Sequence, residues 1–414
     1  MMNDIVGIVL AGGVGRRFWP ITHQKSLLSF MGKPLIRYTI DALVAAGLKT
    51  IVLVANPANQ QVLSALKSNK ANIEVVVQKQ AKGMGDALLT VRRRISNHRI
   101  LVANASDVFT TNLFNEVVVR AEKTDAEIVI PGLKVKEYFP GGYLKVHGSL
   151  VEQIVEKPKP KDRPSDYLNL VVHYFKDAIQ LVKALEAEQD VDDRYERAVS
   201  RMLQSRTAQL LKYDGSFGSL KYPWDILAMS QFLLKRVQGT SVRSKMIHKS
   251  ATIDGPVIIE EGVRVLENAV IKGPVYIGEG SVVGTQALVL ESMIAKSCVV
   301  GYGSEVARSY LGEGCWLHRN YIGDSVLEGD SFFGAGAVTA NFRFDEGSIS
   351  TLVRETRMDT GLQKLGAIVG KGARVGVNAS LMPGVKIGTN AVVGPAVVLY
   401  SDVKDDGRVF VERE

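Results

Sequence analysis

Residues 369–381 read VGKGARVGVNASL, and residues 277–289 read IGEGSVVGTQALV. In both stretches an aliphatic residue stands at every sixth position, usually with a glycine directly after it and a small residue four positions after it. The same period of six runs unbroken through two longer parts of the chain. The aliphatic positions are Ile253, Ile259, Val265, Ile271, Ile277, Val283 and Val289 in the first part, and Val369, Val375, Leu381, Ile387, Val393 and Leu399 in the second.

A repeat of this kind predicts a solenoid. Each hexad forms one short strand and one tight turn, and three hexads complete one coil of a triangular prism. The aliphatic side chain points inward, and many coils must stack because one coil cannot bury its own apolar face. The pattern resembles the left-handed parallel β-helix of hexapeptide-repeat proteins, and it predicts this fold for residues 251–414. Prisms of that type commonly pack as trimers, so the resemblance also implies a homotrimer or a higher homo-oligomer.

The first part of the chain, residues 1–237, has a different pattern, in which strand-like and helix-like segments alternate. Such alternation is typical of a mostly parallel, Rossmann-like sheet covered by helices, and ligands bind such sheets beyond the carboxyl ends of the strands. Residues 238–250 are polar and are predicted to connect the two domains. Strands are predicted over Ile5–Ala11, Thr50–Ala55, Glu74–Gln78 and Arg99–Ala103, and helices over Pro34–Ala46 and Gly83–Arg94.

The composition narrows the class of protein. The net charge of +8 favours anionic partners, but no basic run is longer than Arg92–Arg94 and aromatic residues are not interleaved with basic ones. We therefore expect phosphate-bearing small molecules as partners and no nucleic acid. Two cysteines, Cys298 and Cys315, exclude a disulfide framework and fit a reducing compartment. The apolar run Ile5–Ala11 is too short to span a membrane, so a cytoplasmic enzyme is expected.

The residues after the first predicted strand carry the first chemical motif, LAGGVGRRFWP, over residues 10–20. Gly12, Gly13 and Gly15 let a phosphate chain approach the backbone amides with no Cβ in the way. The motif is not a Walker A loop, because the GK[ST] ending is absent. It is not the dinucleotide fingerprint either, because the third glycine of that fingerprint is missing. Positive charge for the phosphates would come from the basic side chains that follow.

The longer string resembles the signature of the nucleotide-sugar pyrophosphorylase, or sugar-1-phosphate nucleotidylyltransferase, family. That signature is LAGGxGTRLxPLT followed by PKxLL and GKP, and this chain has Arg16 and Gln24 where the family has Thr and Pro. The resemblance implies attack of a sugar-1-phosphate on a nucleoside triphosphate, with release of pyrophosphate. It assigns nucleotide binding to Leu10, Ala11, Gly12, Gly13 and Gly15, and catalysis to Arg17 and Lys25.

More landmarks of this family follow in the same order, so that the resemblance covers about residues 5–237. Gln78 and Gly83 match the segment that reads the base, with Met84 in place of the usual Thr. Asp107 and Asp225 match the two aspartates that hold Mg²⁺ in the family. The residues that match the family's sugar contacts are Gly142, the Glu156 of an EKP sequence, and Asn169.

A second motif lies where the period of six breaks, between about residues 290 and 368. His318, Tyr321 and Asn341 resemble a site of bifunctional enzymes that also N-acetylate an amino-sugar phosphate. The resemblance implies acetyl-CoA as co-substrate, bound between prisms, with His318 as the base. Tyr321 and Asn341 would hold the sugar phosphate or polarise the thioester. An irregular insertion then runs to Lys364, which we include in the acetyl-transfer site; its arginines, suited to a phosphate, are Arg343, Arg354 and Arg357.

Three functions are compatible with these motifs. The first is a bifunctional enzyme that acetylates an amino-sugar-1-phosphate and transfers a nucleotidyl group, a reading that favours uridine and N-acetylglucosamine. The second is a monofunctional nucleotidylyltransferase of the dTDP-glucose, UDP-glucose or GDP-mannose type with a structural β-helix. The third is a regulatory subunit without catalysis. The presence of Arg17, Lys25, Asp107 and Asp225 argues against the third function. His318 and Asn341 favour the first function over the second.

Overall fold

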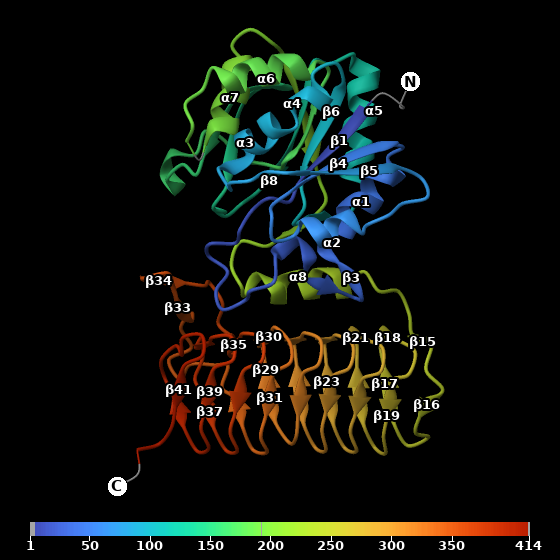
Figure 1. The fold of residues 1–414 in the computed structure, drawn as a ribbon, viewed down its shortest axis with the longest axis vertical. Coiled ribbons are helices and arrows are strands. Elements are labelled where there is room, and N and C mark those ends of the chain that lie inside the picture. The colour runs from blue at the N-terminus through green and yellow to red at the C-terminus, as the bar shows by residue number, and fades with distance from the viewer. Residues whose placement is uncertain (1–4, 192, 413–414) are drawn as a thin grey trace. The chain divides into compact units, whose positions relative to one another are not determined.

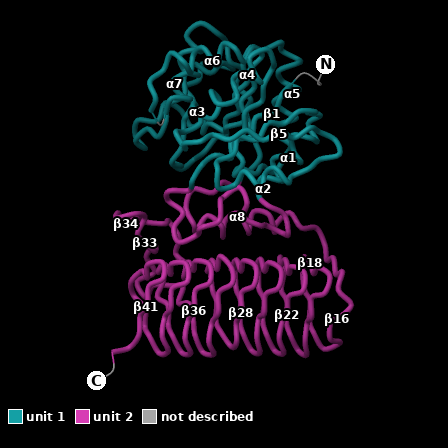
Figure 2. The backbone as a smooth tube through the Cα atoms, viewed as in Figure 1, with its two compact units in different colours: residues 1–14, 35–217 teal, residues 15–34, 218–414 magenta. Residues whose placement is uncertain are grey.

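The computed structural model describes residues 5–191 and 193–412, and the domain ends predicted at residues 1 and 414 lie outside them. The chain divides into two compact units (Figure 2). The first contains the chain up to Val14 together with Leu35–Phe217, and the second contains Gly15–Pro34 together with the chain from Gly218 onward. The glycine-rich loop therefore begins in one unit and continues in the other.

The first unit is built on one ten-stranded mixed sheet with the order β11-β9-β10-β13-β8-β12-β6-β1-β4-β5 (Figure 1). The pairs that link β6, β1, β4 and β5 are all parallel, as the alternating pattern predicts. The strands of this sheet are β1 (Ile5–Leu10), β4 (Thr50–Ala55), β5 (Asn72–Val77), β6 (Arg99–Asn104), β8 (Ile128–Lys134), β9 (Gly142–His147), β10 (Leu150–Glu156), β11 (Tyr167–Asn169), β12 (Val172–Phe175) and β13 (Ala208–Tyr213). Two short strands outside it are β7 (Asp107–Phe109) and β14 (Phe217–Ser219), which spans the boundary between the units.

Helices cover the sheet because each presents an apolar stripe to it. Buried residues of α3, α4, α6 and α7 form one core with inward residues of β1, β4, β6 and β8. The helix predicted over Gly83–Arg94 is interrupted at Val91, which separates α3 from α4. The Asp177 side chain caps α6 by accepting the Ile179 amide, as an N-cap residue does. The helices and 3₁₀ turn of this unit are α1 (Leu35–Ala45), α2 (Gln60–Ser64), α3 (Gly83–Thr90), α4 (Arg92–Ile95), α5 (Leu113–Thr124), η3 (Pro160–Asp162), α6 (Ala178–Glu186) and α7 (Arg194–Met202).

The second unit contains a parallel β-helix, the segment Gly15–Pro34 and the helix α8. Three sheets form the faces of the prism. The first contains β15 (Ser241–Val242), β18 (Val257–Ile259), β21 (Val275–Ile277), β24 (Met293–Ile294), β27 (Tyr310–Leu311), β30 (Val326–Leu327), β35 (Ile368–Val369) and β38 (Lys386–Ile387). The second contains β16 (Met246–Ile247), β19 (Arg264–Val265), β22 (Val282–Val283), β25 (Val299–Val300), β28 (Trp316–Leu317), β31 (Phe332–Phe333), β36 (Arg374–Val375), β39 (Val392–Val393) and β41 (Arg408–Val409). The third contains β17 (Thr252–Asp254), β20 (Val270–Lys272), β23 (Leu288–Leu290), β26 (Glu305–Ala307), β29 (Tyr321–Gly323), β32 (Val338–Thr339), β37 (Ser380–Leu381) and β40 (Val398–Leu399). The remaining elements of the unit are η2 (Lys25–Leu27), β2 (Ser29–Phe30), β3 (Lys33–Pro34), α8 (Asp225–Leu234), β33 (Ser350–Val353) and β34 (Thr356–Asp359).

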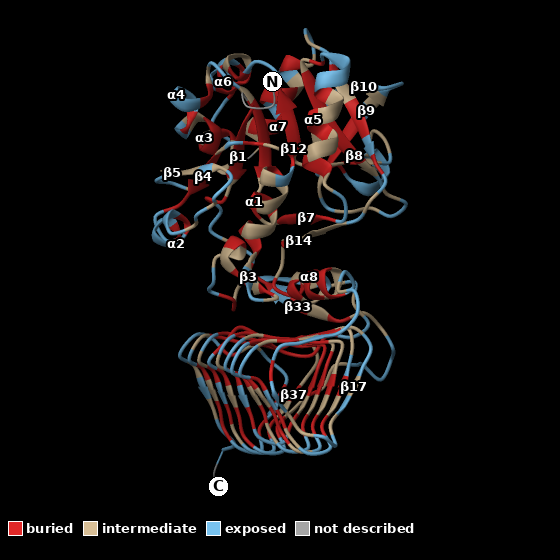
Figure 3. Cartoon of the chain, turned by 90° about the vertical axis from the view of Figure 1, so that its right-hand side faces the viewer, coloured by how far each residue is buried: buried red, intermediate tan, exposed pale blue. Residues whose placement is uncertain are grey.

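The predicted aliphatic ladder is confirmed. Twelve of the thirteen positions lie in the buried core of the prism, and the first, Ile253, is partly buried against that core. Figure 3 shows buried residues in every part of the stack of coils. The glycine after the aliphatic residue has a steric cause. A Cβ added at Gly388 would lie 2.3 Å from the backbone nitrogen of Asp405 in the next coil, so no larger residue fits. The small residues predicted at the corners, such as Ala373, are buried as well.

The prism continues through the part of the sequence where the period of six is lost. Val265 pairs with Val283, a full coil of 18 residues, whereas Val300 pairs with Leu317 after 17 and Leu317 pairs with Phe333 after 16. Shortened coils keep the inward positions stacked although the sequence period shifts. The one long departure among the described residues of the prism is the insertion between β32 and β35, where β33 and β34 form an antiparallel hairpin.

The predicted domain limits stay a prediction, because the compact units do not test them directly. Within the stretch 238–250, which was predicted to be a connection, β15 and β16 already pair with β18 and β19 of the prism. Among the described residues, no helix combines the length and apolar character needed to cross a membrane.

The inward direction of the aliphatic positions can be tested with two neighbouring valines of one strand. In β22, Val283 is fully buried while Val282 points away from the core and is only partly buried. Val283→Ala should lower the free energy of unfolding by on the order of 2 kcal/mol, because two methyl groups leave a cavity between stacked coils. Urea unfolding followed by circular dichroism measures the loss. Val282→Ala is the control, and an equal loss in both variants would contradict the inward ladder.

Candidate functional site

In the first unit, the glycine-rich loop starts directly after β1 and packs against the residues predicted to read the base. A Cβ at Gly12 would lie 2.5 Å from Oε1 of Gln78, so only glycine allows this approach. The buried Gln78 amide donates to the Gly83 carbonyl at 3.2 Å and to an Asp86 carboxylate oxygen at 2.8 Å. Residues that are separated by more than sixty positions in the sequence are thus brought together, and their role in nucleotide binding stays a prediction.

Two buried asparagines hold the loop backbone, and sequence reasoning missed both. Asn59 Nδ2 donates to the Ala11 carbonyl at 2.8 Å, and Asn56 Nδ2 donates to the Gly12 carbonyl at 3.3 Å. Both side chains are almost completely buried. Their carboxamides fix the backbone where it leaves β1, and the local signal was an Asn-Pro-Ala-Asn sequence directly after β4. Gly13 has no atom within 4 Å of an added Cβ, so the loop is open on that side.

In the second unit, Lys25 stands at the start of η2 and is held by backbone carbonyls. Its ammonium group donates to the carbonyls of Leu220 at 3.0 Å and Lys221 at 3.1 Å, and it lies 4.7 Å from the centre of the Phe18 ring. Arg17, four residues after Gly13, is exposed. Both predicted catalytic cations therefore lie in the segment Gly15–Pro34.

The two predicted metal ligands belong to different compact units. Asp107 begins β7 and is largely buried, and its carboxylate accepts from Asn104 Nδ2 at 3.0 Å. Asp225 begins α8, and its Oδ2 accepts the amides of Lys221 and Tyr222, each at 2.7 Å. Burial raises the pKa of Asp225, although these amides and the charge of Lys25 oppose the rise. A buried carboxylate with a raised pKa gains from a bound cation, and carboxylate oxygens are the donors that Mg²⁺ prefers, so both residues fit Mg²⁺.

The three predicted sugar-binding residues converge in the first unit. A Cβ at Gly142 would lie 3.1 Å from Oε2 of Glu156 and 3.5 Å from Cβ of Asn169. They come from the start of β9, the end of β10 and the end of β11. The Lys157 ammonium pairs with Glu156 at 2.7 Å. Burial, and then the charge of Glu156, raise the pKa of Glu196 to about 7, which identifies a second carboxyl group near this site that the motifs did not indicate.

A buried hydrogen-bond chain fixes the Asn169 carboxamide. His173 Nε2 lies 2.8 Å from Asn169 Oδ1, and His173 Nδ1 lies 2.8 Å from the Tyr195 hydroxyl. Burial lowers the pKa of His173 to about 3, so the ring is neutral. Because Asn169 Oδ1 only accepts, Nε2 carries the proton and Nδ1 accepts from Tyr195. Among the described residues Asn169 Nδ2 has no acceptor, and Asn169 is partly exposed, which leaves this N–H group available to a ligand.

The predicted acetyl-transfer residues are brought together only in part. Asn341 Nδ2 donates to the Tyr321 hydroxyl at 3.2 Å and to the Asp324 carboxylate. Arg308 binds both oxygens of Asp324 at 2.8 Å, and this ion pair was not predicted. The backbone of Lys364 lies next to this cluster, because Lys364 forms a β-bridge with the residue after Asn341. 

His318 is exposed, and its ring lies edge-on to Phe332 with 5.3 Å between centroids. Its amide nitrogen donates to Oδ1 of Asn320 at 2.8 Å. No contact joins the His318 side chain to the Tyr321–Asn341 cluster within the described part of this single chain. The role of His318 as the base therefore stays a prediction.

The first unit combines a mixed sheet with the glycine-rich loop, the Gln78 amide and the three predicted sugar-binding residues, and the second unit is a parallel β-helix. This combination defines a nucleotidyl transferase with a hexapeptide-repeat domain. The nucleotidyl transferase family model matches residues 6–218. A bifunctional sugar-1-phosphate nucleotidylyltransferase/acetyltransferase of Sulfurisphaera tokodaii is 30% identical over 95% of this chain and 97% of its own. The bifunctional protein GlmU of Methanocaldococcus jannaschii is 27% identical over 98% of both chains. A crystal structure of UDP-glucose pyrophosphorylase complexed with UDP-glucose shares the fold, with a TM-score of 0.52 and 19% identity over 57% of this chain and 100% of that chain.

This chain therefore belongs to the nucleotidyl transferase family, and within it to the bifunctional sugar-1-phosphate nucleotidylyltransferase/acetyltransferases. The first of the three functions considered from the sequence is confirmed: the chain is an enzyme with nucleotidyltransferase and acetyltransferase activities. The monofunctional and regulatory alternatives are not favoured, because the bifunctional relatives match over nearly the whole chain.

The Tyr195–His173–Asn169 chain generates a prediction about sugar affinity. Tyr195→Phe removes the hydroxyl that holds His173 in its Nε2–H form, so the Asn169 carboxamide loses its fixed orientation. The KM for the sugar-1-phosphate should rise by about 5- to 10-fold, the equivalent of one hydrogen bond, while the KM for the nucleotide stays unchanged. Steady-state kinetics measure both constants. Tyr174→Phe, next to His173 on β12, is the control. An unchanged sugar KM in Tyr195→Phe would contradict the orientation proposed for Asn169.

Proposed function

We propose that the enzyme makes a nucleoside diphosphate amino sugar by two group transfers. The first joins an acetyl group from acetyl-CoA to the amine of an amino-sugar-1-phosphate. The second joins the acetylated sugar-1-phosphate to the nucleotidyl group of a nucleoside triphosphate. The acetyltransferase activity favours glucosamine-1-phosphate as the first substrate, and hence uridine and N-acetylglucosamine in the product. The observation that carries the nucleotidyl-transfer assignment is the packing of Gly12 against the Gln78 amide, which joins the phosphate loop to the base-reading segment.

In the nucleotidyl transfer, an oxygen of the sugar-1-phosphate attacks the α-phosphorus of the triphosphate. A new P–O bond forms, the bond from the α-phosphorus to the bridging oxygen breaks, and pyrophosphate leaves. No general base is needed, because the attacking phosphate is already ionised at neutral pH. Lys25 and Arg17 stabilise the charge that develops on the phosphates, and the loop amides at Gly12 and Gly13 bind the triphosphate. Mg²⁺, held by Asp107 and Asp225, would neutralise phosphate charge when bound.

In the acetyl transfer, the amine nitrogen attacks the thioester carbonyl. A C–N bond forms, the C–S bond breaks, and the thiolate of CoA leaves. His318 takes the proton that the nitrogen loses and can return it to the thiolate. Tyr321 and Asn341, which the Asp324 carboxylate orients, would hold the sugar phosphate or polarise the thioester carbonyl. Because His318 does not contact the cluster within one chain, the proposed homotrimer, with acetyl-CoA between prisms, is part of this proposal.

The first experiment is a substrate panel for pyrophosphate release. N-Acetylglucosamine-1-phosphate with UTP should be the best pair, and activity should require Mg²⁺. Asp107→Asn and Lys25→Ala should each lower kcat/KM by on the order of 100-fold or more, because each removes charge stabilisation from the transferring phosphates. Asp125→Asn is the matched control, since Asp125 is an exposed carboxylate that pairs only with Lys176 among the described residues. Activity that survives Asp107→Asn would remove the metal assignment.

The acetyl transfer has a separate test, thiol release from acetyl-CoA with glucosamine-1-phosphate. Asn341→Ala should lower this rate by on the order of 10- to 100-fold, because the residue that is hydrogen-bonded to both Tyr321 and Asp324 is lost. Pyrophosphate release with N-acetylglucosamine-1-phosphate should be unchanged in the same variant. A fall in both rates would mean that Asn341 supports the fold and not the acetyl-transfer site.

A further inference from the structure

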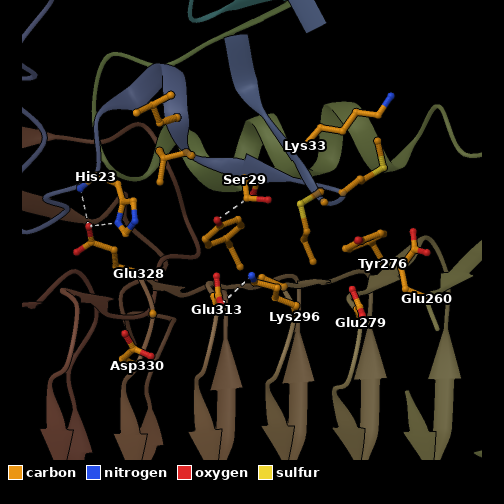
Figure 4. Close-up of a pocket in the computed structure, with 18 of the residues that line it drawn as sticks. His23, Ser29, Lys33, Glu260, Tyr276, Glu279, Lys296, Glu313, Glu328 and Asp330 are labelled. Carbon is orange, nitrogen blue, oxygen red and sulfur yellow. Dashed lines mark hydrogen bonds and ion pairs between the residues drawn. The ribbon is translucent and has the colours of Figure 1, made fainter. Parts of the chain in front are cut away.

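The segment Gly15–Pro34 carries Arg17 and Lys25, and it is attached to the prism through three separate polar contacts. Trp19 Nε1 donates to the Asp405 carboxylate at 3.1 Å. The Tyr310 hydroxyl donates to the Ser29 carbonyl at 2.9 Å. Between them, Glu328 accepts hydrogen bonds from the backbone of the segment, as Figure 4 shows for His23 and Glu328. All of these residues belong to the second compact unit.

A cavity of about 820 Å³ separates much of the segment from the prism. Its lining includes His23, Ser29 and Lys33 from the segment, and Glu313 and Glu328 from the coils (Figure 4). Close apolar packing normally fixes one element against another. Here the cavity leaves part of the segment without such packing. The Phe30 ring against Tyr310 and the Lys386 ammonium group over the Trp19 ring hold the segment together with these hydrogen bonds.

Glu328 makes the densest of these attachments. Its Oε1 accepts the amides of Thr22 and His23, each at 2.7 Å, the Thr22 hydroxyl at 2.8 Å and the His23 ring nitrogen Nδ1 at 2.9 Å. Its Oε2 accepts the Lys371 amide of the neighbouring coil at 2.9 Å. The side chain is completely buried. One carboxylate therefore binds the segment with one oxygen and the next coil with the other.

The charge of Glu328 is stabilised by these donors. Burial alone would raise the pKa of Glu328, but the hydrogen bonds from His23 and Thr22 outweigh it and the pKa is lowered. The group is therefore an anion at neutral pH, and hydrogen bonds to an anion are stronger than those between neutral groups. The Glu328 position lies outside residues 6–218, which match the family model, so no motif of the nucleotidyl transferase family contains it.

Lys25 follows His23 by two residues. Its ammonium group donates to the carbonyls of Leu220 and Lys221 with the segment in its present position, so a shift of the segment would move Lys25 away from them. We propose that Glu328 is a positioning residue for nucleotidyl transfer, through which a coil of the β-helix sets the place of Lys25. This inference rests on the catalytic role proposed for Lys25. It makes part of the β-helix necessary for the first activity, although the β-helix contributes no group to that reaction.

The test compares Glu328→Gln with a carboxylate of the same cavity that does not touch the segment. Glutamine keeps the shape but removes the charge, and it turns an N–H group toward either the segment amides or the Lys371 amide. We expect kcat for pyrophosphate release to fall by about 10-fold, with acetyl transfer from acetyl-CoA unchanged as an internal measure of prism integrity. Glu313→Gln is the control, since Glu313 pairs with Lys296 of its own prism at 3.0 Å, and both activities should be retained. Glu328→Asp, which restores the charge, should recover part of kcat.

Hydrogen–deuterium exchange gives a readout that does not depend on catalysis. Amides of residues 21–25 should exchange faster in Glu328→Gln than in the parent enzyme, whereas amides of β27 and β30 should not change. If Glu328→Gln has the same kcat and the same exchange rates as the parent enzyme, the proposal is overturned. Loss of both activities together with faster exchange throughout the prism would overturn it as well, because Glu328 would then serve the fold alone. If Lys25→Ala retains full activity, the role proposed for Lys25 fails and the kinetic part of this inference fails with it, while the exchange rates still decide whether Glu328 holds the segment.

Discussion

The stacking of each coil of the β-helix on the next is the constraint on which the rest of the second unit depends. Its strands have only two or three residues, which is too few to be stable alone, and each gains hydrogen bonds and apolar contacts only from the coils above and below. The spacing between coils is therefore fixed by the backbone, and side chains at the corners must conform to it. Gly388 is an example of this constraint, because a Cβ at this position would lie 2.3 Å from the backbone nitrogen of Asp405 in the next coil.

A stack with fixed spacing can hold polar groups in positions that a flexible loop could not. The ladder in the third sheet admits Thr339 at an inward position, and its hydroxyl is satisfied by the Gly323 amide and the Ser325 hydroxyl, each at 3.0 Å. The same spacing places Asp324 against Arg308 of the preceding coil and against Asn341 beyond it. Buried polar networks of this kind are stable only when their members are paired, so the coils that build the fold also build the Tyr321–Asn341 cluster that is proposed for acetyl transfer.

The sequence predicts the parts of this fold that repeat and misses the parts that depend on long-range contacts. The aliphatic period was sufficient for the outer coils, but between residues 290 and 339 coils of 16 and 17 residues shift the period while the stacking persists. The family motifs led to Gln78, Gly142 and Glu156, which the structure brings close to Gly12 and Asn169 as expected. Glu328 had no such signal, since 306 residues separate it from Thr22 and its partners are mostly backbone groups, which any sequence provides.

The residues that were missed share a physical role, and this role explains why motifs do not contain them. A phosphate-binding loop works through backbone amides, so its own side chains are small and cannot fix its shape. The shape must come from polar side chains elsewhere, and in the first unit Asn59 binds the Ala11 carbonyl. In the second unit, Glu328 holds the backbone that follows the loop in the same way, through the Thr22 and His23 amides. Each is a buried polar group whose desolvation is offset by hydrogen bonds to the main chain. Catalytic side chains are constrained by the reaction, whereas these supporting groups are constrained only by the backbone they hold, and so they can be recognised only once the chain is folded.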